Sequence, residues 1–200
     1  MKAKIVVLYE DKRVQAKGYG PHELVKACVL DVVDQDDQGD RAALMANLSI
    51  EARPLKGSGN IYTSCRNVSL IAPRGQPVVA VLDRDRVHDL LGLPKPISQQ
   101  QVEKRLKDES DAPAQLHVCL LEENLESVIE AIKVCAPGQN ADILARALDK
   151  EPNAQDVLLR RVAHAPTRAI RECILQRVPS LKAIVELLIS LLAPPSGLTA

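Results

Sequence analysis

Three short apolar segments, at residues 4–9, 78–82 and 116–121, contain few polar residues. Apolar runs of this length, rich in β-branched residues, are typical of strands buried on both faces of a parallel sheet. Residues 48–53 are predicted to form a further strand. The pattern therefore predicts a small, mostly parallel sheet.

Helical spacing fills the intervals between these strands. In residues 21–33 apolar side chains recur three and four positions apart, and Pro21 stands at the start, where helices tolerate proline. Residues 98–109 show a similar pattern, with Ser98 as a predicted N-cap. Strands that alternate with helices predict an α/β fold with helices flanking a Rossmann-like sheet. Two shorter helices are predicted at residues 86–91 and from the 122–127 segment to about 134.

Beyond Pro137 and Gly138 the pattern is helical throughout, and prolines separate the segments. We therefore predict an α/β domain at residues 1–136 and a C-terminal helical extension at residues 137–200. Thr167 is a possible N-cap of one of these helices. The predicted helices span residues 141–149, 154–163, 167–177 and 181–192.

Composition narrows the choice of partners. The 200 residues are 46% hydrophobic, with no Phe, no Trp and three Tyr, so aromatic platforms for single-stranded nucleic acid are not expected. Lys plus Arg (26) balance Asp plus Glu (26), so any affinity for a polyanion must come from local patches. Residues 31–40 contain five Asp and are expected to extend into solvent.

Five scattered cysteines, without a C-x-x-C motif, are interpreted as reduced thiols in the core of a cytoplasmic protein. The apolar run at residues 4–9 is too short for a signal sequence. No stretch of about 18 apolar residues is present, so no membrane span is expected.

Acidic residues follow two of the predicted strands. Glu10 ends the 4–9 segment, and Asp83 and Asp85 follow the 78–82 segment. Carboxylates at the carboxyl ends of neighbouring parallel strands converge where α/β sheets bind ligands, and Mg²⁺ prefers such oxygen ligands. The alternative is that they are ordinary solvated carboxylates, because an Asp-x-Asp motif alone is a weak signal.

A strand followed by Glu10, and a later strand followed by Asp83 and Asp85, resembles the Toprim fold of topoisomerases, bacterial primases and OLD-family nucleases. The resemblance covers roughly residues 3–135. It implies that Glu10 corresponds to the family's glutamate and that Asp83 and Asp85 correspond to its metal-binding pair. By the same resemblance Glu123 or Glu126, after the 116–121 strand, would be a further ligand; acids in the first turn of a helix also favour the helix dipole.

The resemblance to small stand-alone Toprim nucleases implies a Mg²⁺-dependent (or Mn²⁺-dependent) nuclease or related phosphodiester-processing enzyme, of the kind found in bacterial defence systems. Its partner would be DNA or RNA. Glu10 would act as a metal ligand or as a general base. Arg84 has an alternative role, an ion pair with the aspartates in place of the metal. The basic residues near the site that would hold the phosphate are Lys12, Arg13, Lys56, Arg84 and Arg86.

Two other functions fit the same pattern. A non-catalytic Rossmann-like module would bind a partner protein through its C-terminal helices, as part of a larger defence or regulatory complex. The same helices would alternatively bind a second copy of the chain. A nucleotide-binding regulator would use the same strand-end crevice. Arginines of the helical extension, among them Arg160, Arg161, Arg168 and Arg171, would contact nucleic acid or pair with neighbours such as Asp156 and Glu172.

Overall fold

The structure, a computed structural model, describes residues 4–10, 19–34, 44–46, 48–56, 58–93, 95–121 and 125–192. The side chains of residues 58, 85 and 86 lie outside that description. Contacts between Cα atoms divide the chain into two units. The sheet unit comprises Met1–Ala16, Ser49–Glu122 and Leu188–Ala200, and the helical unit comprises Lys17–Leu48 and Glu123–Leu187.

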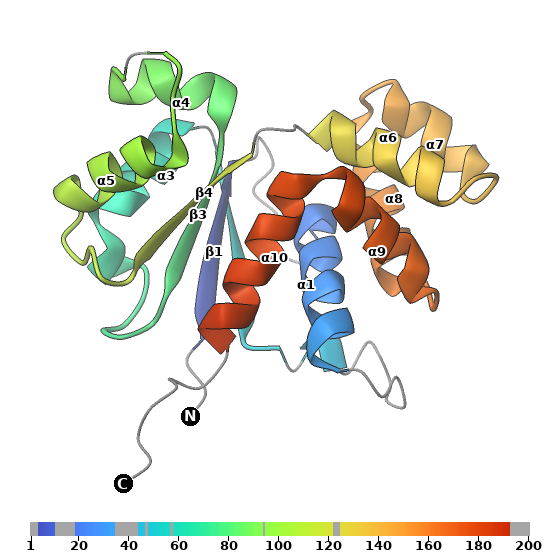
Figure 1. Cartoon of the computed structure of the whole chain (residues 1–200), viewed down its shortest axis with the longest axis horizontal. Helices are drawn as coiled ribbons and strands as arrows, with labels where there is room; N and C mark the ends of the chain where they lie inside the picture. The colour runs from blue at the N-terminus through green and yellow to red at the C-terminus, as the bar shows by residue number, and fades with distance from the viewer. Residues whose placement is uncertain are drawn as a thin grey trace, which may run out of the picture. The chain divides into compact units, whose positions relative to one another are not determined.

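The sheet unit is built on four parallel strands in the order β2-β1-β3-β4 (Figure 1). This confirms the predicted α/β class with a parallel sheet. In the two central strands every residue before the final acid is hydrophobic and buried, as the sequence pattern predicted. The strands are β1 (Ile5–Glu10), β2 (Ile50–Leu55), β3 (Val78–Asp83) and β4 (Leu116–Leu121).

One face of the sheet packs against three helices of the same unit (Figure 1). Leu8, Ala80 and Val118 contribute to a single apolar cluster with side chains from all three helices. The helices are α3 (Ser58–Arg66), α4 (Arg84–Leu91) and α5 (Gln99–Glu109), and a short 3₁₀ helix, η1 (Val68–Leu70), follows α3.

Ser98 caps α5 as predicted. Its Oγ accepts a hydrogen bond from the Gln101 backbone N at 3.2 Å, and Gln101 Oε1 accepts one from the Ser98 backbone N at 2.9 Å. This reciprocal capping box satisfies donors that the first turn of a helix leaves without intrahelical partners.

The segment after residue 53 is rich in turn-forming residues but adopts regular structure. Strand β2 continues through Pro54 to Leu55, and α3 begins at Ser58. Proline is tolerated here because β2 is an edge strand, which pairs with a neighbour on one side only. The turn-rich composition of residues 54–60 concealed both features.

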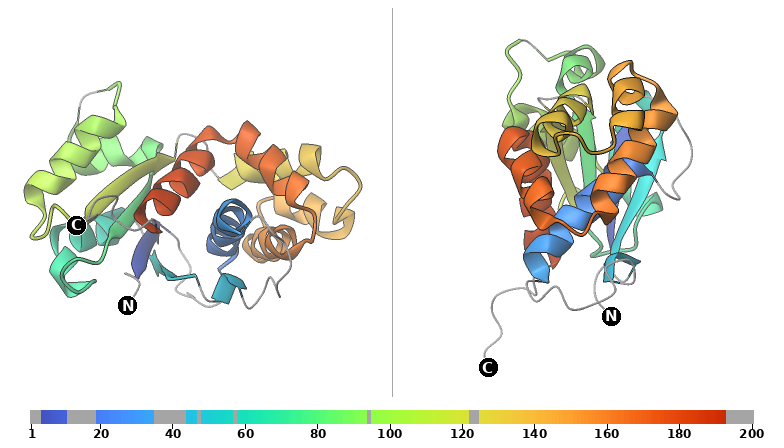
Figure 2. Two further views of the ribbon diagram at one scale, coloured as in Figure 1. Left: turned by 60° about the horizontal axis from the view of Figure 1, so that its bottom comes forward. Right: turned by 90° about the vertical axis from the view of Figure 1, so that its right-hand side faces the viewer.

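The helical unit contains α1 and the helices that follow β4. Figure 2 shows α1 beside α8, which it contacts more extensively than any other helix of the described chain. The four helices predicted after residue 137 are confirmed. The bounds are α1 (Gly20–Val33), α6 (Leu125–Cys135), α7 (Ala141–Leu148), α8 (Pro152–His164), α9 (Arg168–Arg177) and α10 (Pro179–Leu192).

The division into units differs from the single boundary expected after residue 136. Helix α1, which belongs to the first predicted domain, groups with α6 to α9, and the division of the C-terminal part falls within α10. The assignment of residues 137–200 as a domain of their own stays a prediction.

A buried ion pair joins α1 to α9 in the helical unit. The Arg171 guanidinium, fully buried, donates from Nε to Asp31 Oδ2 at 2.6 Å and from Nη2 to Asp31 Oδ1 at 3.1 Å. Its Nη1 donates to the carbonyl oxygens of Val162 at 3.0 Å and Ala165 at 2.6 Å, at the end of α8. Asp31 was expected to extend into solvent, and this was wrong because its carboxylate has a buried partner distant in sequence.

Gly20 allows the start of α1 to approach α8 closely. Its backbone N donates to Asp156 Oδ1 at 2.7 Å, and a Cβ built at Gly20 would lie 2.6 Å from the Asp156 carbonyl oxygen. Any side chain at this position would force the two helices apart.

The cysteines correct the sequence interpretation in part. Cys135, the last residue of α6, and Cys173 of α9 form a disulfide, whereas both were expected to be reduced. Cys28, Cys65 and Cys119 are free and buried, as predicted. The pairing was missed because the two residues are 38 positions apart and become neighbours only when α6 packs against α9.

Among the helices of the described chain, none combines the length and the apolar character that crossing a bilayer requires.

Candidate functional site

Two of the predicted acidic residues lie at the carboxyl edge of the sheet, on neighbouring strands. Glu10 is the last residue of β1, and Asp83 is the last residue of β3. Both side chains are partly exposed, although the residues that precede them in the strands are buried. The sheet thus brings Glu10 and Asp83, which are distant in the sequence, to one edge.

The strand register fixes how far apart their backbones lie. Tyr9 of β1 pairs with Val81 of β3, so Glu10 is one residue and Asp83 two residues beyond the same rung. With strands about 4.8 Å apart and a rise of about 3.3 Å per residue, the two Cα atoms are separated by about 6 Å. Two carboxylates can reach a shared cation from this separation.

The two side chains leave the sheet on opposite faces. Glu10 pairs with Leu55, which packs against the apolar cluster under α3, α4 and α5. Asp83 pairs with Leu121 and shares its face with Val81, which is not part of that cluster. Because side chains alternate along a strand, a ligand that contacts both acids must lie beyond the strand ends and not against either face.

The backbone changes direction between the two aspartates. Asp83 is the N-cap residue of α4 with extended dihedral angles, and Asp85 lies two residues further on, in the first turn of that helix. The backbone of Asp85 therefore also lies next to the carboxyl edge, and its part in metal binding stays a prediction.

Arg84 has a defined partner away from the strand. Its Nη2 donates to the Ile97 carbonyl oxygen, 2.8 Å away, in the segment that precedes α5. This bond ties the start of α4 to the start of α5. This hydrogen bond tests neither role that the sequence suggested for Arg84, a contact to phosphate or an ion pair with the aspartates.

The structure describes only some of the other residues predicted for the site. Lys56 is exposed just after β2, and its carbonyl oxygen accepts a hydrogen bond from the Asn60 side chain. Three of the predicted residues, Lys12, Arg13 and Glu123, lie outside the described residues, as does the side chain of Arg86. Their roles stay predictions.

Glu126 lies in the first turn of α6, within the helical unit. Its Oε1 is 3.3 Å from Lys150 Nζ, and both residues line a cavity of about 210 Å³ beside α6 and α7. Both side chains are well exposed to solvent, so the ion pair adds little stability. The predicted role of Glu126 as a further metal ligand stays a prediction.

Behind the carboxyl edge, β1 and β4 each bury an ionisable side chain among apolar neighbours, Tyr9 and Cys119. Burial raises the pKa of the Tyr9 phenol well above its usual value. Burial, with a smaller contribution from the charge of Glu103, raises the pKa of the Cys119 thiol to about 12. The partly exposed carboxylates of Glu10 and Asp83 therefore stand at the border of an uncharged interior.

The residues present suit a hard divalent cation to a limited extent. Mg²⁺ is commonly held by one or two protein carboxylates, with water and substrate oxygens completing its shell, and two carboxylates end adjacent strands here. Within the part of the chain whose side chains are described, no group of three or more His, Cys, Asp or Glu is placed to hold a metal.

Three arginines on the surface of the helical unit pair with neighbouring acids. The distances are 3.5 Å from Arg160 Nε to Asp156 Oδ2, 3.1 Å from Arg161 Nη1 to Asp142 Oδ1 and 3.0 Å from Arg168 Nε to Glu172 Oε1. The sequence left open whether these arginines contact nucleic acid or pair locally, and the structure shows local ion pairs.

Comparisons with known proteins include one weak structural similarity. No family model matches the chain, and no curated protein matches it. The fold is similar to a solved structure, the C-terminal region of the OLD protein from Xanthomonas campestris pv. campestris, at 14% sequence identity and a TM-score of 0.37, covering 95% of this chain and 96% of that chain. A TM-score this low carries no argument about family or activity.

Proposed function

We propose that this chain is a Mg²⁺-dependent (or Mn²⁺-dependent) enzyme that cleaves or otherwise processes phosphodiester bonds in DNA or RNA. Glu10, Asp83 and Asp85 are the proposed metal ligands. The observation that supports the proposal is the position of Glu10 and Asp83, which end adjacent parallel strands with Cα atoms about 6 Å apart.

When bound, the metal would activate water and neutralise charge on the scissile phosphate. The protein itself would fix where the two carboxylates begin, at the ends of β1 and β3. Tyr9 and Leu82, the residues immediately before the two acids, are 5% and 1% exposed, so the strand ends are anchored in the core. Because the two side chains leave on opposite faces, both would have to turn beyond the strand ends to meet one cation, while the anchored strand ends keep their backbones in place.

The proposal extends to family and cellular context. From the order of strands and acids we propose membership in the Toprim superfamily, close to its small stand-alone nucleases. A role in bacterial defence is proposed only as a consequence of that membership. The proposed location is the cytoplasm; the three buried free thiols accord with it, whereas the Cys135–Cys173 disulfide is of a kind more common in oxidising compartments.

The test compares acid substitutions at the proposed site with one elsewhere on the same unit. Purified protein is incubated with single-stranded and double-stranded DNA and RNA, with Mg²⁺, Mn²⁺ or EDTA. Metal binding is measured separately by calorimetric titration with Mn²⁺. Asp83→Asn and Glu10→Gln remove charge at the strand ends, and Asp108→Asn removes an exposed charge of α5 as the matched control.

Cleavage should require the metal. Changes that act only indirectly on a metal cost 10–100-fold, so loss of a direct ligand should lower the rate by on the order of 100-fold or more. Asp108→Asn should cleave at the rate of the unmodified protein. Cleavage that survives Asp83→Asn, or equal Mn²⁺ affinity in all four proteins, would contradict the proposal.

A second candidate function is that of a non-catalytic module that binds a protein partner. The pairing of Arg160, Arg161 and Arg168 with neighbouring acids favours it, because these arginines are engaged within the helical unit. Absence of metal-dependent cleavage together with absence of Mn²⁺ binding would favour this candidate over the enzyme.

A further inference from the structure

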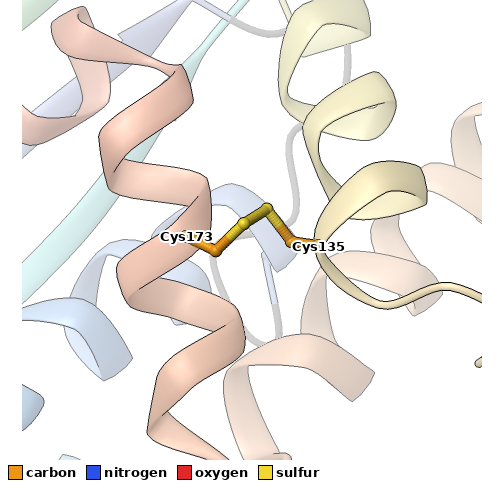
Figure 3. Close-up of a disulfide and its surroundings, with 2 residues drawn as sticks. All are labelled: Cys135 and Cys173. Atoms are coloured by element: carbon orange, nitrogen blue, oxygen red, sulfur yellow. A yellow bond between two sulfur atoms is a disulfide. The ribbon is translucent and has the colours of Figure 1, made fainter.

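The disulfide of the helical unit joins the end of one helix to the middle of another. Figure 3 shows Cys135 at the end of α6 and Cys173 on α9, with their Cα atoms 5.8 Å apart. This separation lies within the usual range for disulfides, so the helices pack at a distance that the bond can span. The covalent loop that it closes contains α7 and α8.

The paired cysteines differ from the other three in their access to solvent. Cys135 and Cys173 are partly exposed. Cys28 and Cys65 are 0% exposed and Cys119 is 4% exposed. Burial also raises the pKa of the Cys65 thiol to about 12, so little of it is thiolate at neutral pH. The disulfide is therefore the more exposed part of the cysteine set, while the other three cysteines are shielded.

We propose that Cys135 and Cys173 form a reversible, thiol-responsive clamp, which holds α6 against α9 when oxidised and releases it when reduced. The proposal is independent of the function proposed above. It rests on the proximity of the two cysteines, on their exposure and on the burial of the remaining three.

The reaction is thiol–disulfide exchange with a small monothiol and its disulfide. One external thiolate attacks a sulfur of the pair, which forms a mixed disulfide and frees the other sulfur as a thiolate. A second external thiolate then attacks the external sulfur of the mixed disulfide. This forms the external disulfide and frees the second protein sulfur as a thiolate. Two electrons pass to the protein, both sulfurs become thiols after taking up protons, and the reverse sequence restores the clamp.

Reduction should affect α6 more than α9. Helix α9 carries Arg171, whose guanidinium holds Asp31 of α1 and two carbonyl oxygens at the end of α8 independently of the disulfide. Helix α6 keeps its apolar contacts through Val128, Ile129 and Ile132 but loses its covalent tie. The expected reduced state is therefore one in which α6 opens more often while α9 stays in place.

The experiment follows the full chain across a series of reduced and oxidised glutathione mixtures at neutral pH. Thiols are counted by alkylation with a polymer-tagged maleimide before and after unfolding. Thermal unfolding gives the midpoint, and hydrogen exchange with mass spectrometry reports on residues 125–135 and 168–177. The variants are the double substitution Cys135→Ser with Cys173→Ser and, as a matched control, Cys28→Ala.

The folded oxidised protein should show no reactive thiol, and the folded reduced protein should show two. Reduction should lower the unfolding midpoint by about 4–16 °C, because the reduced unfolded chain is no longer restrained by the covalent loop. On reduction, the rate of amide hydrogen exchange should rise more at residues 125–135 than at residues 168–177. The double Ser variant should match the reduced protein and ignore the glutathione ratio, and Cys28→Ala should keep the full response.

Three results would overturn the proposal. The first is five thiols in the unfolded protein that has never been reduced, which would mean that the pair does not form. The second is a disulfide that millimolar glutathione fails to reduce in the folded protein, which would make it a permanent structural bond. The third is a midpoint that reduction leaves unchanged.

Discussion

The sheet unit and the helical unit differ in what they bury. Every polar or charged residue that is buried in the described chain belongs to the helical unit, whereas the sheet unit buries apolar side chains. Six residues make up that polar set: His22, Lys26, Asp31, Gln155, Arg171 and Ser180.

The difference shows two ways of specifying a packed structure. Apolar runs stabilise the sheet through burial, which is non-directional and tolerates exchange of one aliphatic residue for another of similar volume. Buried polar groups must meet particular partners, because an unpaired one costs free energy. The helical unit should therefore be the more sensitive of the two to single polar substitutions.

The largest effect is expected for Asp31→Ala. It would leave the Arg171 guanidinium buried without its carboxylate, at a cost of about 3–5 kcal/mol in the free energy of unfolding. The matched change in the sheet unit is Glu103→Ala, which removes the partner of Lys107 on α5 at 2.6 Å in a pair that is about one third exposed. That change should cost less than about 1 kcal/mol.

Urea denaturation measures both substitutions. A joint replacement, Asp31→Leu with Arg171→Met, should recover much of the loss, since an apolar pair leaves no buried charge. Equal losses for Asp31→Ala and Glu103→Ala would remove the proposed difference between the units.

Substitution of two glycines should change the free energy of unfolding by an intermediate amount. Gly20→Ala places a Cβ 2.6 Å from the Asp156 carbonyl oxygen, so α1 and α8 must separate, at about 1–3 kcal/mol. In the sheet unit Gly59 lies in α3, and a Cβ added there would meet nothing within 4 Å, so Gly59→Ala should stabilise by about 0.5–1 kcal/mol.

The two alanine variants should therefore move the thermal midpoint in opposite directions in a calorimetric scan. A Gly20→Ala protein as stable as the parent would show that the close approach of the two helices is not needed.

The smallest effect is expected at the helix caps. Ser98→Ala removes the capping box of α5 and should cost about 1 kcal/mol. Thr167 occupies the N-cap position of α9, as predicted, but its side chain makes no capping hydrogen bond. Thr167→Ala should consequently change the free energy of unfolding by about 0.5 kcal/mol or less. Unfolding in guanidinium chloride measures the stability of both variants. A larger loss of stability for Thr167→Ala than for Ser98→Ala would contradict the expected order.

Local patterns in the sequence predicted most of the elements. The strands at residues 78–82 and 116–121 stand out because a strand buried on both faces has almost no polar residues. Helix α3 was missed because Gly59 and Asn60 are weak helix formers, and apolar contacts of Ile61 and Cys65 stabilise it only in the folded chain.

Pairings between distant residues could not be read from the sequence. Nothing in the residues around Asp31 indicates that its partner is Arg171, and nothing around Cys135 indicates Cys173. The convergence of Glu10 and Asp83 was predictable in outline, because the carboxyl ends of parallel strands share an edge. That they leave on opposite faces depends on the register, which only the structure supplies.

The buried pair between α1 and α9 also constrains the order of events during synthesis. Asp31 leaves the ribosome 140 residues before Arg171. At translation rates of 5–20 residues per second, α1 waits about 7–28 s for the partner that neutralises its carboxylate. For that interval α1 exposes apolar side chains such as Leu24 and Val29, which are buried in the finished fold. The nascent chain should therefore expose this apolar surface until α9 has been synthesised, and slower translation would lengthen that interval.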